Sequence, residues 1–240
     1  MPKRLVILPT YNEAENIPVL IPRIFKYLPD CTVLVIDDGS PDRTAEIAKS
    51  LTGTYPNLEV INQGKKGGLG SAYRFGFLWG ISRGFDELIQ MDSDMSHRVR
   101  DLSNLLEMKS RLGADLVIGS RWISGGEIEN WSKGRELLSR FANRYVRAVL
   151  NLGINDSTSG FRVYSADLLK RIELEDIKSE GYCFQIEMTR AARKVGGKIV
   201  EVPITFRERE SGVSKMSKAI VIEAMALVTL WGLKRVIRSR

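Results

Sequence analysis

The sequence contains very little cysteine and histidine. Among its 240 residues there are two cysteines, Cys31 and Cys183, and one histidine, His97. Two cysteines cannot build a disulfide-rich scaffold, and their scarcity is typical of a reducing, cytoplasmic compartment. A zinc site made of Cys and His, or a Ser-His-Asp triad, would depend entirely on His97. Both kinds of site are therefore disfavoured.

Long hydrophobic runs are also missing. The N-terminal run Leu5–Pro9 has five residues, whereas the apolar core of a signal peptide needs at least about 7. The run Ala219–Leu233 is interrupted by Glu223 and Thr229. As a helix it would be about 22 Å long, short of the roughly 30 Å of a bilayer core. The sequence therefore predicts neither a signal peptide nor a membrane-spanning helix.

The remaining composition is that of a globular protein. Hydrophobic residues make up 43% and charged residues 27% of the chain, which excludes a disordered, a collagen-like and a multi-span membrane protein. Lys and Arg number 36 against 29 Asp and Glu, a net charge of +7. This excess indicates an anionic partner: nucleic acid, a membrane surface or a phosphate-rich substrate.

The first half of the chain alternates short apolar runs with stretches of helical periodicity. Several runs are rich in β-branched residues and lack period-two alternation, which is typical of strands covered on both faces. We expect strands at Arg4–Pro9, Thr32–Asp38, Leu58–Asn62, Glu87–Asp92 and Asp115–Gly119. We expect helices at Glu13–Tyr27, Asp42–Leu51, Leu69–Arg83 and Arg100–Arg111. This order predicts an α/β fold with a mostly parallel central sheet flanked by helices.

The second half is expected to extend the same domain, because no repeat, low-complexity tract or linker interrupts it. Helices are predicted at Ser132–Leu150, at Tyr182–Val195 and from about Lys215 to the C-terminus. Strands are predicted near Phe161–Tyr164 and at Lys198–Phe206, with a turn-rich stretch at Gly153–Gly160.

Parallel sheets bind ligands at the carboxyl ends of their strands, so the polar residues there are the first candidates. The first strand ends in Pro9-Thr-Tyr-Asn-Glu13 and lacks the glycine-rich turn of a dinucleotide site. Tyr11 can stack on a base or ribose, and Glu13 can accept its hydrogen bonds. A plain helix start, with Asn12 as its cap, accounts for the same residues.

Three further strand ends carry polar groups. Asp37 and Asp38 can bind a ribose or base, or simply form a turn. The loop Gln63–Ser71 is rich in glycine and lysine, which suggests phosphate, although it does not fit the P-loop pattern and a flexible loop accounts for it equally. Asp92 and Asp94 would point to one side of an extended segment and can jointly hold Mg²⁺ or Mn²⁺; solvated carboxylates are the alternative. Together, the four ends fit a metal-bridged nucleotide diphosphate.

At this point the residues resemble a known family, the GT-A-fold family 2 glycosyltransferases, and within it the polyprenyl-phosphate (dolichol-phosphate) mannosyltransferases. Beyond the four strand ends, the resemblance covers nearly the whole chain in order. It rests on Gly119-Ser-Arg121, Trp131-Ser132, Arg135–Asn143, Asp156-Ser-Thr-Ser-Gly-Phe-Arg162, Gly181–Glu187, Glu201–Arg209 and Ser214-Lys215.

The resemblance implies how the donor is held. The donor-binding residues would be Pro9, Tyr11, Glu13, Ile36, Asp37, Asp38, Asp92, Ser93, Asp94, Arg121, Arg209 and Lys215. Asp92 and Asp94 would bind Mg²⁺ or Mn²⁺, which bridges the diphosphate. Position 96 is Ser, where some relatives carry Gln as a further metal-site residue.

The resemblance also implies the reaction, an inverting transfer of mannose from GDP-mannose to a polyprenyl (dolichyl) phosphate. Its catalytic residues would be Asp94, Arg121, Arg135, Ser139 and Arg209. The acceptor phosphate is already anionic near neutral pH, so no strong general base is required. Arginines and the cation would offset the repulsion between the two phosphate substrates. A UDP-sugar donor, such as UDP-glucose, is the alternative.

A lipid acceptor implies contact with a membrane. Arg140, Arg144 and Arg147 share one face of the predicted helix 132–150, and either solvent or anionic headgroups can cover them. We expect a catalytic domain over residues 1–213 and a membrane-associating or docking helix over 214–240, with packing on the chain's own core as the alternative. The protein would lie on the cytoplasmic face of the membrane, with a small anchoring subunit as a possible partner. Because the basic residues lie largely in these segments, no nucleic-acid partner is expected.

Overall fold

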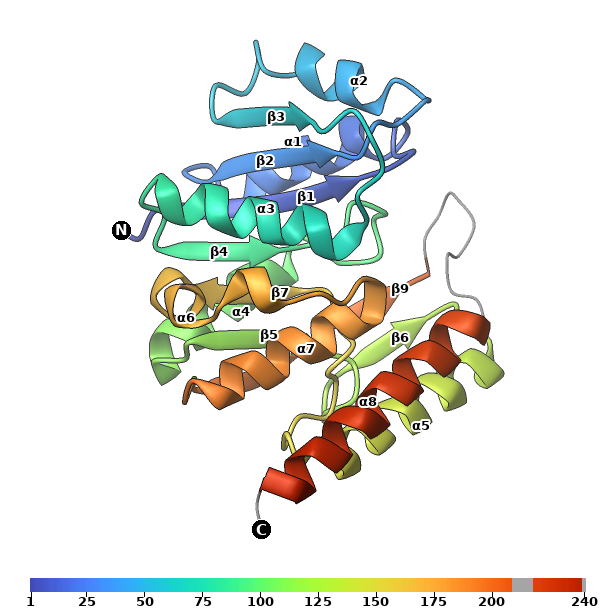
Figure 1. Ribbon diagram of the computed structural model, residues 1–240. Coiled ribbons are helices and arrows are strands. Elements are labelled where there is room, and N and C mark those ends of the chain that lie inside the picture. Colours follow the sequence, from blue (N-terminus) through green and yellow to red (C-terminus); the bar gives the residue numbers. More distant parts are fainter. Residues whose placement is uncertain (209–217, 239–240) are drawn as a thin grey trace.

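A computed structural model describes residues 1–208 and 218–238 and has the expected α/β architecture (Figure 1). The central sheet has seven strands in the order β3-β2-β1-β4-β7-β5-β8. All its pairs are parallel except those of β7, which is antiparallel to both neighbours. The strands are β1 (Arg4–Thr10), β2 (Thr32–Asp37), β3 (Leu58–Asn62), β4 (Glu87–Gln90), β5 (Leu116–Ser120), β7 (Arg162–Ser165) and β8 (Ile199–Pro203).

Helices cover both faces of this sheet. In Figure 1, α3, α6 and α7 lie in front of the sheet and α1 and α4 lie behind it. The helices are α1 (Ile17–Tyr27), α2 (Thr44–Ser50), α3 (Leu69–Ser82), α4 (Asp101–Leu112), α5 (Lys133–Leu150), α6 (Ala166–Arg171), α7 (Gly181–Lys194) and α8 (Lys218–Arg238), with a short 3₁₀ turn at Leu174–Asp176.

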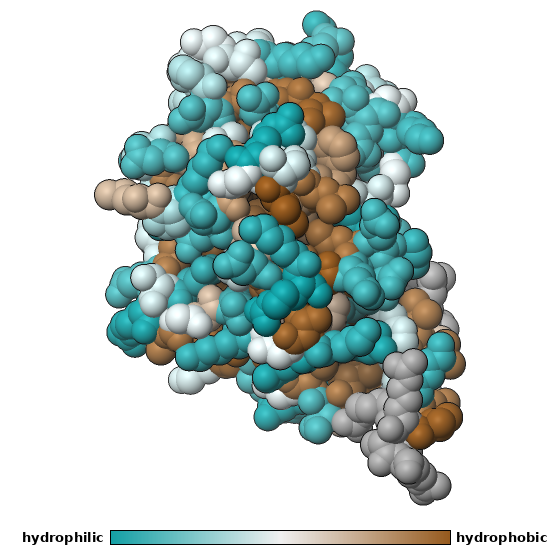
Figure 2. All heavy atoms as spheres, turned by 60° about the vertical axis from the view of Figure 1, so that its left-hand side comes forward, coloured by the Kyte–Doolittle hydropathy of each residue, from teal (hydrophilic) through white to brown (hydrophobic). Residues whose placement is uncertain are grey.

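The residues of β1 show why its apolar run forms a central strand. Alternate side chains point to opposite faces of a strand. Leu5 and Ile7 pack into the core on the α3 side, and Val6 and Leu8 pack into the core on the α1 side. The approach of α3 is close: a Cβ at Gly76 would lie 2.6 Å from Cγ2 of Ile7. The surface, by contrast, is largely hydrophilic, with some hydrophobic side chains showing in the middle of the face in Figure 2.

The structure differs from the predicted elements at several points. The expected strand 198–206 is two strands, because the chain leaves the main sheet after Pro203 and continues as β9 (Thr205–Arg207). There it pairs with β6 (Glu127–Glu129), a strand that the sequence did not reveal. The helix expected from Glu13 begins at Ile17, because the amides of Glu13 and Ala14 donate to Thr44 and Asp42 instead. The short helices at 166–171 and 174–176 were also not predicted.

Helix α8 packs along α5, as Figure 1 shows. Val228 is buried in the core, and the Tyr145 and Thr229 hydroxyl oxygens lie 2.6 Å apart. In the part of the chain that the structure describes, no helix combines the length and apolarity required to cross a membrane. The domain boundary expected at 213/214 falls outside the described residues.

Candidate active site

A polar cavity of about 260 Å³ opens at the carboxyl edge of the parallel strands. The ends of β1, β2 and β4, the loop before α3, the loop 156–160 and the start of α7 contribute to it. Seven of the predicted donor-binding residues line this cavity: Pro9, Tyr11, Glu13, Asp38, Asp92, Ser93 and Asp94. The structure thus brings together side chains from three separate strand ends.

Three of the predicted donor-binding residues that the structure describes, Ile36, Asp37 and Arg121, do not line this cavity. Ile36 is fully buried and packs in the core on the α3 side. Asp37 is also fully buried, and its carboxylate accepts hydrogen bonds from the Thr10 hydroxyl at 2.9 Å and from Ser40. Asp37 therefore fixes the turn after β2, which in turn positions Asp38.

Asp38 has one carboxylate oxygen that accepts hydrogen bonds from the protein and one that has no partner among the described residues. Its Oδ2 accepts hydrogen bonds from the amides of Gly67 and Gly68, at 3.2 and 2.9 Å. Its Oδ1 is buried and accepts no hydrogen bond from any described residue. A buried acceptor without a donor is costly. The N–H or O–H of a bound nucleoside can supply that donor.

Three amides of the glycine-lysine loop, those of Gly67, Gly68 and Gly70, donate to acidic side chains. Asp38 accepts from two of its amides, and the Gly70 amide donates to the Glu180 carboxylate at 2.6 Å. Lys66 lies over the Tyr11 ring, with its Nζ 4.1 Å from the ring centroid. Asp38 and Glu180 are distant from this loop in the sequence. The glycine-rich pattern therefore gave no sign that acidic side chains of the protein accept hydrogen bonds from its amides.

Asp92 and Asp94 both line the cavity, but they do not lie on an extended strand. β4 ends at Gln90, the chain bends at residues 93–95, and Met95 has a φ of +63°, so the expectation of an extended segment was wrong. Asp92 Oδ1 accepts a hydrogen bond from the Tyr73 hydroxyl at 3.0 Å. Asp94 Oδ1 accepts one from the Ser96 amide at 3.1 Å. Burial, and then the charge of Asp92, raise the pKa of Tyr73 well above its ordinary value, so it remains a donor.

These carboxylates fit a divalent cation that keeps other ligands. No group of three or more His, Cys, Asp and Glu side chains suited to a metal occurs among the described residues. Mg²⁺ and Mn²⁺ are well served by one or two carboxylates, with water and substrate phosphate completing the shell. Asp92 and Asp94 would supply the protein oxygens of such a site, as the sequence predicts.

Gly160 gives a specific test of how tightly Asp92 is held. A Cβ at this position would lie 2.9 Å from Oδ2 of Asp92. We expect Gly160→Ala to displace that carboxylate and to lower kcat/KM for the reaction that the family resemblance implies by about tenfold or more. Its melting temperature should stay close to that of the wild type. Gly53→Ala, whose Cβ meets nothing within 4 Å, is the control, and equal activity of the two variants would contradict this geometry.

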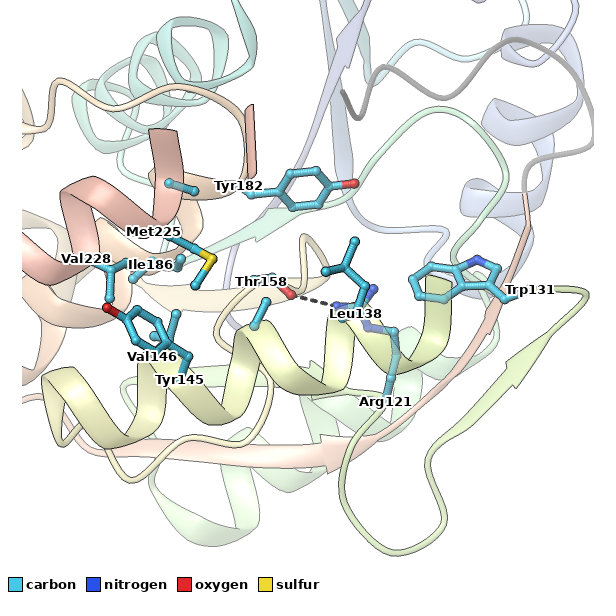
Figure 3. Close-up of a pocket in the computed structure, with 13 residues that line it drawn as sticks. Arg121, Trp131, Leu138, Tyr145, Val146, Thr158, Tyr182, Ile186, Met225 and Val228 are labelled. Carbon is cyan, nitrogen blue, oxygen red and sulfur yellow. Dashed lines mark hydrogen bonds between the residues drawn. The ribbon is translucent and has the colours of Figure 1, made fainter. Parts of the chain in front are cut away.

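A second, smaller cavity of about 70 Å³ adjoins the first and is mostly apolar (Figure 3). Its walls come mainly from α5, α7 and α8, and Thr158 and Tyr182 line both cavities. Arg121 and Ser139 also line the smaller cavity. A cationic side chain therefore borders an apolar space directly beside the polar site.

Arg121 is buried and held by Asp156. Its Nε and Nη2 each donate to one Asp156 carboxylate oxygen at 2.7 Å, and its Nη2 also donates to the Thr158 hydroxyl at 2.9 Å. Asp156 is fully buried. Burial alone would raise the pKa of Asp156, but the charge and hydrogen bonds of Arg121 outweigh it and lower that pKa. The pair remains ionised, which fixes the guanidinium in the wall between the two cavities.

The other predicted phosphate-binding residues lie on and near α5. Arg135 donates from Nη1 to the Glu208 carboxylate at 2.5 Å and lies over the Trp131 ring. Ser139 follows one helical turn later. Arg209 and Lys215 lie outside the described residues, so their roles stay predictions.

Several residues of the site had no predicted role. Thr158, Gly160, Tyr182 and Gln185 line the polar cavity, and Asp156 positions Arg121. All five fall in segments that carried the family resemblance. The concentration of polar residues in the turn-rich stretch before β7 was the available signal.

Comparisons with known proteins agree with this geometry. Residues 5–173 match the family described as Glycosyl transferase family 2. The chain is 47% identical to polyprenol monophosphomannose synthase of Mycolicibacterium smegmatis, over 99% of this chain and 90% of that protein. It is also 47% identical to undecaprenyl-phosphate mannosyltransferase of Micrococcus luteus, over 95% of this chain and 93% of that protein.

Solved structures show the same fold. Glucosyl-3-phosphoglycerate synthase from Mycobacterium tuberculosis superposes with a TM-score of 0.70 at 20% identity, over 98% of this chain and 80% of that chain. A Pyrobaculum calidifontis mannosyltransferase in complex with GDP-Man and Mn²⁺ gives 0.60 at 17% identity, over 99% and 64%. The expected GT-A fold is confirmed. The chain therefore belongs to glycosyl transferase family 2.

Proposed function

We propose that this protein transfers mannose from GDP-mannose to a polyprenyl phosphate, with inversion at the anomeric carbon. The observation that carries the proposal is the junction of two unlike cavities. The polar cavity, which is lined by the carboxylates of Asp92 and Asp94, adjoins the apolar cavity, which is bordered by Arg121. Thr158 and Tyr182 line both cavities. The names of the two relatives at 47% identity support a polyprenyl phosphate acceptor and mannose as the sugar.

The polar cavity suits the nucleotide sugar. Tyr11 offers an aromatic face, and the unpartnered oxygen of Asp38 offers an acceptor for the nucleoside. Asp92 and Asp94 would hold the divalent cation, which, when bound, offsets the charge of the diphosphate and of the departing GDP. Tyr73 orients Asp92 through its hydroxyl, and Ser96 orients Asp94 through its amide.

The apolar cavity suits the acceptor. Leu138, Val146, Ile186, Met225 and Val228 offer hydrophobic walls to a prenyl chain (Figure 3). Arg121, Ser139 and nearby Arg135 offer donors to its phosphate, and guanidinium groups pair well with phosphate oxygens. The phosphate oxygen is anionic and attacks the anomeric carbon directly. The protein's part is to align two anionic substrates and to screen their repulsion.

Transfer of labelled mannose tests the proposal directly. Purified protein is given GDP-mannose and polyprenyl phosphate, with and without Mn²⁺, and then UDP-glucose in place of GDP-mannose. We expect metal-dependent mannosyl transfer and a β-linked product from the α-linked donor. A preference for UDP-glucose would overturn the choice of donor. A covalent glycosyl-enzyme or a product of retained configuration would overturn inversion.

The surface beside the apolar cavity supports a peripheral position on a membrane. On α5, Leu137 is 69% and Phe141 is 56% exposed. Arg140 and Arg144 lie on α5 near these side chains. Exposed apolar side chains bordered by arginines are typical of helices that lie at a lipid interface. A lipid-linked acceptor would then reach the cavity from the bilayer surface.

Paired substitutions on α5 test this membrane surface. We expect Leu137→Glu with Phe141→Glu to weaken sedimentation with anionic vesicles by at least tenfold, because each buried apolar side chain contributes about 1.5–3 kcal/mol. Phe75→Glu with Leu78→Glu is the matched control, since these exposed side chains lie on α3. Transfer to a short, water-soluble prenyl phosphate should be retained. Equal vesicle binding by both variants would reject this surface.

A further inference from the structure

A second polar cavity, of about 390 Å³, lies apart from the two described above. Helix α1, the segment 95–100 and β9 form its walls. Five cationic side chains line it, and we call this set the basic groove: Arg23, Lys26, Arg98, Arg100 and Arg207. The proposed transfer reaction gives none of these five residues a role.

The charges of the basic groove are not balanced by the described residues. Arg98 and Arg207 share one carboxylate, that of Glu129, and Arg207 Nε lies 2.9 Å from it. Arg100 Nε is 3.9 Å from the Asp101 carboxylate. Arg23 and Lys26 form no ion pair with any described residue, and no described acidic residue lines the groove. A concave surface that carries charges of one sign concentrates ions of the opposite charge.

The groove lies behind the turn that carries Asp92 and Asp94. His97 separates the two sites: its side chain is 1% exposed, and its Nε2 lies 3.5 Å from Asp92 Oδ2. Both ring nitrogens of His97 lack a hydrogen bond from or to the described residues. The Arg207 amide donates to the Ser96 carbonyl at 3.0 Å, which ties β9 to this turn. The groove and the aspartates therefore share one short segment of chain.

We propose that the basic groove is a second site for an anionic phosphate group, distinct from the donor and acceptor cavities. Guanidinium groups from three parts of the chain can donate to several oxygens of one phosphate. A bound phosphate would screen the mutual repulsion of the five cations and hold α1, the segment 95–100 and β9 together. Its source is a soluble phosphate or the headgroup of an anionic lipid.

Binding of pyrophosphate tests the site without reference to transfer. The protein is titrated with pyrophosphate by calorimetry without divalent cation, and GDP binding is measured separately in the presence of Mn²⁺. We expect Arg23→Glu with Lys26→Glu to weaken pyrophosphate binding at least tenfold and to leave GDP binding unchanged. Both side chains are exposed, so the fold should be retained, and circular dichroism checks this. Lys49→Glu with Lys194→Glu is the control, because these exposed lysines on α2 and α7 make the same change in net charge.

Sedimentation with vesicles distinguishes a soluble phosphate from the headgroup of an anionic lipid. The same variants are sedimented with phosphatidylglycerol vesicles and with phosphatidylcholine vesicles. Loss of pyrophosphate binding alone in the Arg23/Lys26 variant supports a soluble phosphate, and loss of phosphatidylglycerol binding alone supports a lipid headgroup. Losses that match those of the control pair, or no loss in either arm, would overturn the proposal.

Discussion

Replacing Asp94 with Ala is expected to lower kcat/KM for mannosyl transfer by about 10²–10³-fold, the usual cost of removing one preorganised electrostatic contact. Asp94 is 8% exposed and lines the cavity next to Asp92. Its loss leaves a single carboxylate to hold the cation. Initial rates over a range of Mn²⁺ concentrations measure the effect, and calorimetry measures Mn²⁺ binding directly.

Asp30→Ala is the control, because Asp30 is an exposed carboxylate in the turn before β2. It removes the same charge from the protein and should leave transfer unchanged. If Asp94→Ala retained activity near the wild-type level, the metal assignment would be wrong. If it lost activity but bound Mn²⁺ as the wild type does, Asp94 would act on the substrate and not on the metal.

Replacing Asp156 with Ala is expected to destabilise the protein by about 3–5 kcal/mol, because it leaves a buried guanidinium without its partner. Arg121 is 5% exposed and Asp156 is fully buried. This is a large part of the roughly 5–15 kcal/mol that stabilises a typical domain. Urea unfolding measures it. Transfer should also fall, since Arg121 loses the contacts that orient it.

A double variant separates the two effects. Arg121→Met with Asp156→Leu replaces the pair by apolar groups, which is often neutral for stability. We expect it to unfold at a urea concentration close to that of the wild type and to remain poorly active. Recovery of activity together with stability would show that Arg121 has no part in the reaction.

The ion pair also predicts an acid dependence. The pKa of Asp156 is lowered in the folded protein, so its stabilisation is complete above the unfolded value of about 3.9. That stabilisation is lost as the pH falls from there through the lowered native pKa. The double variant should therefore lose less stability than the wild type below about pH 4.

The sequence predicted the first half of the fold well, for a physical reason. The strands β1 and β2 are built on continuous apolar runs, and the ends predicted for β1 to β3 lie within one residue of those observed. The break between β8 and β9 was not predictable from composition, because the apolar pattern runs on through Val202, Ile204 and Phe206. Only the partner strand β6, three residues long, reveals it.

The residues of the candidate site also divide into those that the local sequence predicts and those that only the tertiary structure reveals. Residues at or just after the ends of predicted strands, such as Tyr11, Asp38 and Asp92, were found from sequence. Thr158 and Tyr182 were not given a role, because they reach the cavity from a loop and from the first turn of α7, whose positions depend on the tertiary fold. The hydrogen bonds from the glycine-lysine loop to the carboxylates of Asp38 and Glu180 were not predicted for the same reason.

The one antiparallel strand of the sheet has a consequence for folding. β7 lies between β4 and β5, which precede it in the chain. Because it runs against its neighbours, the segment before it, 156–160, reaches the edge where the other strands end. A chain growing on the ribosome therefore cannot join β4 to β5, or close the wall around Asp92, until residue 165 has been made. The first 120 residues contain Asp92 and Asp94 but lack the loop 156–160 and the start of α7, which complete the cavity around these two side chains.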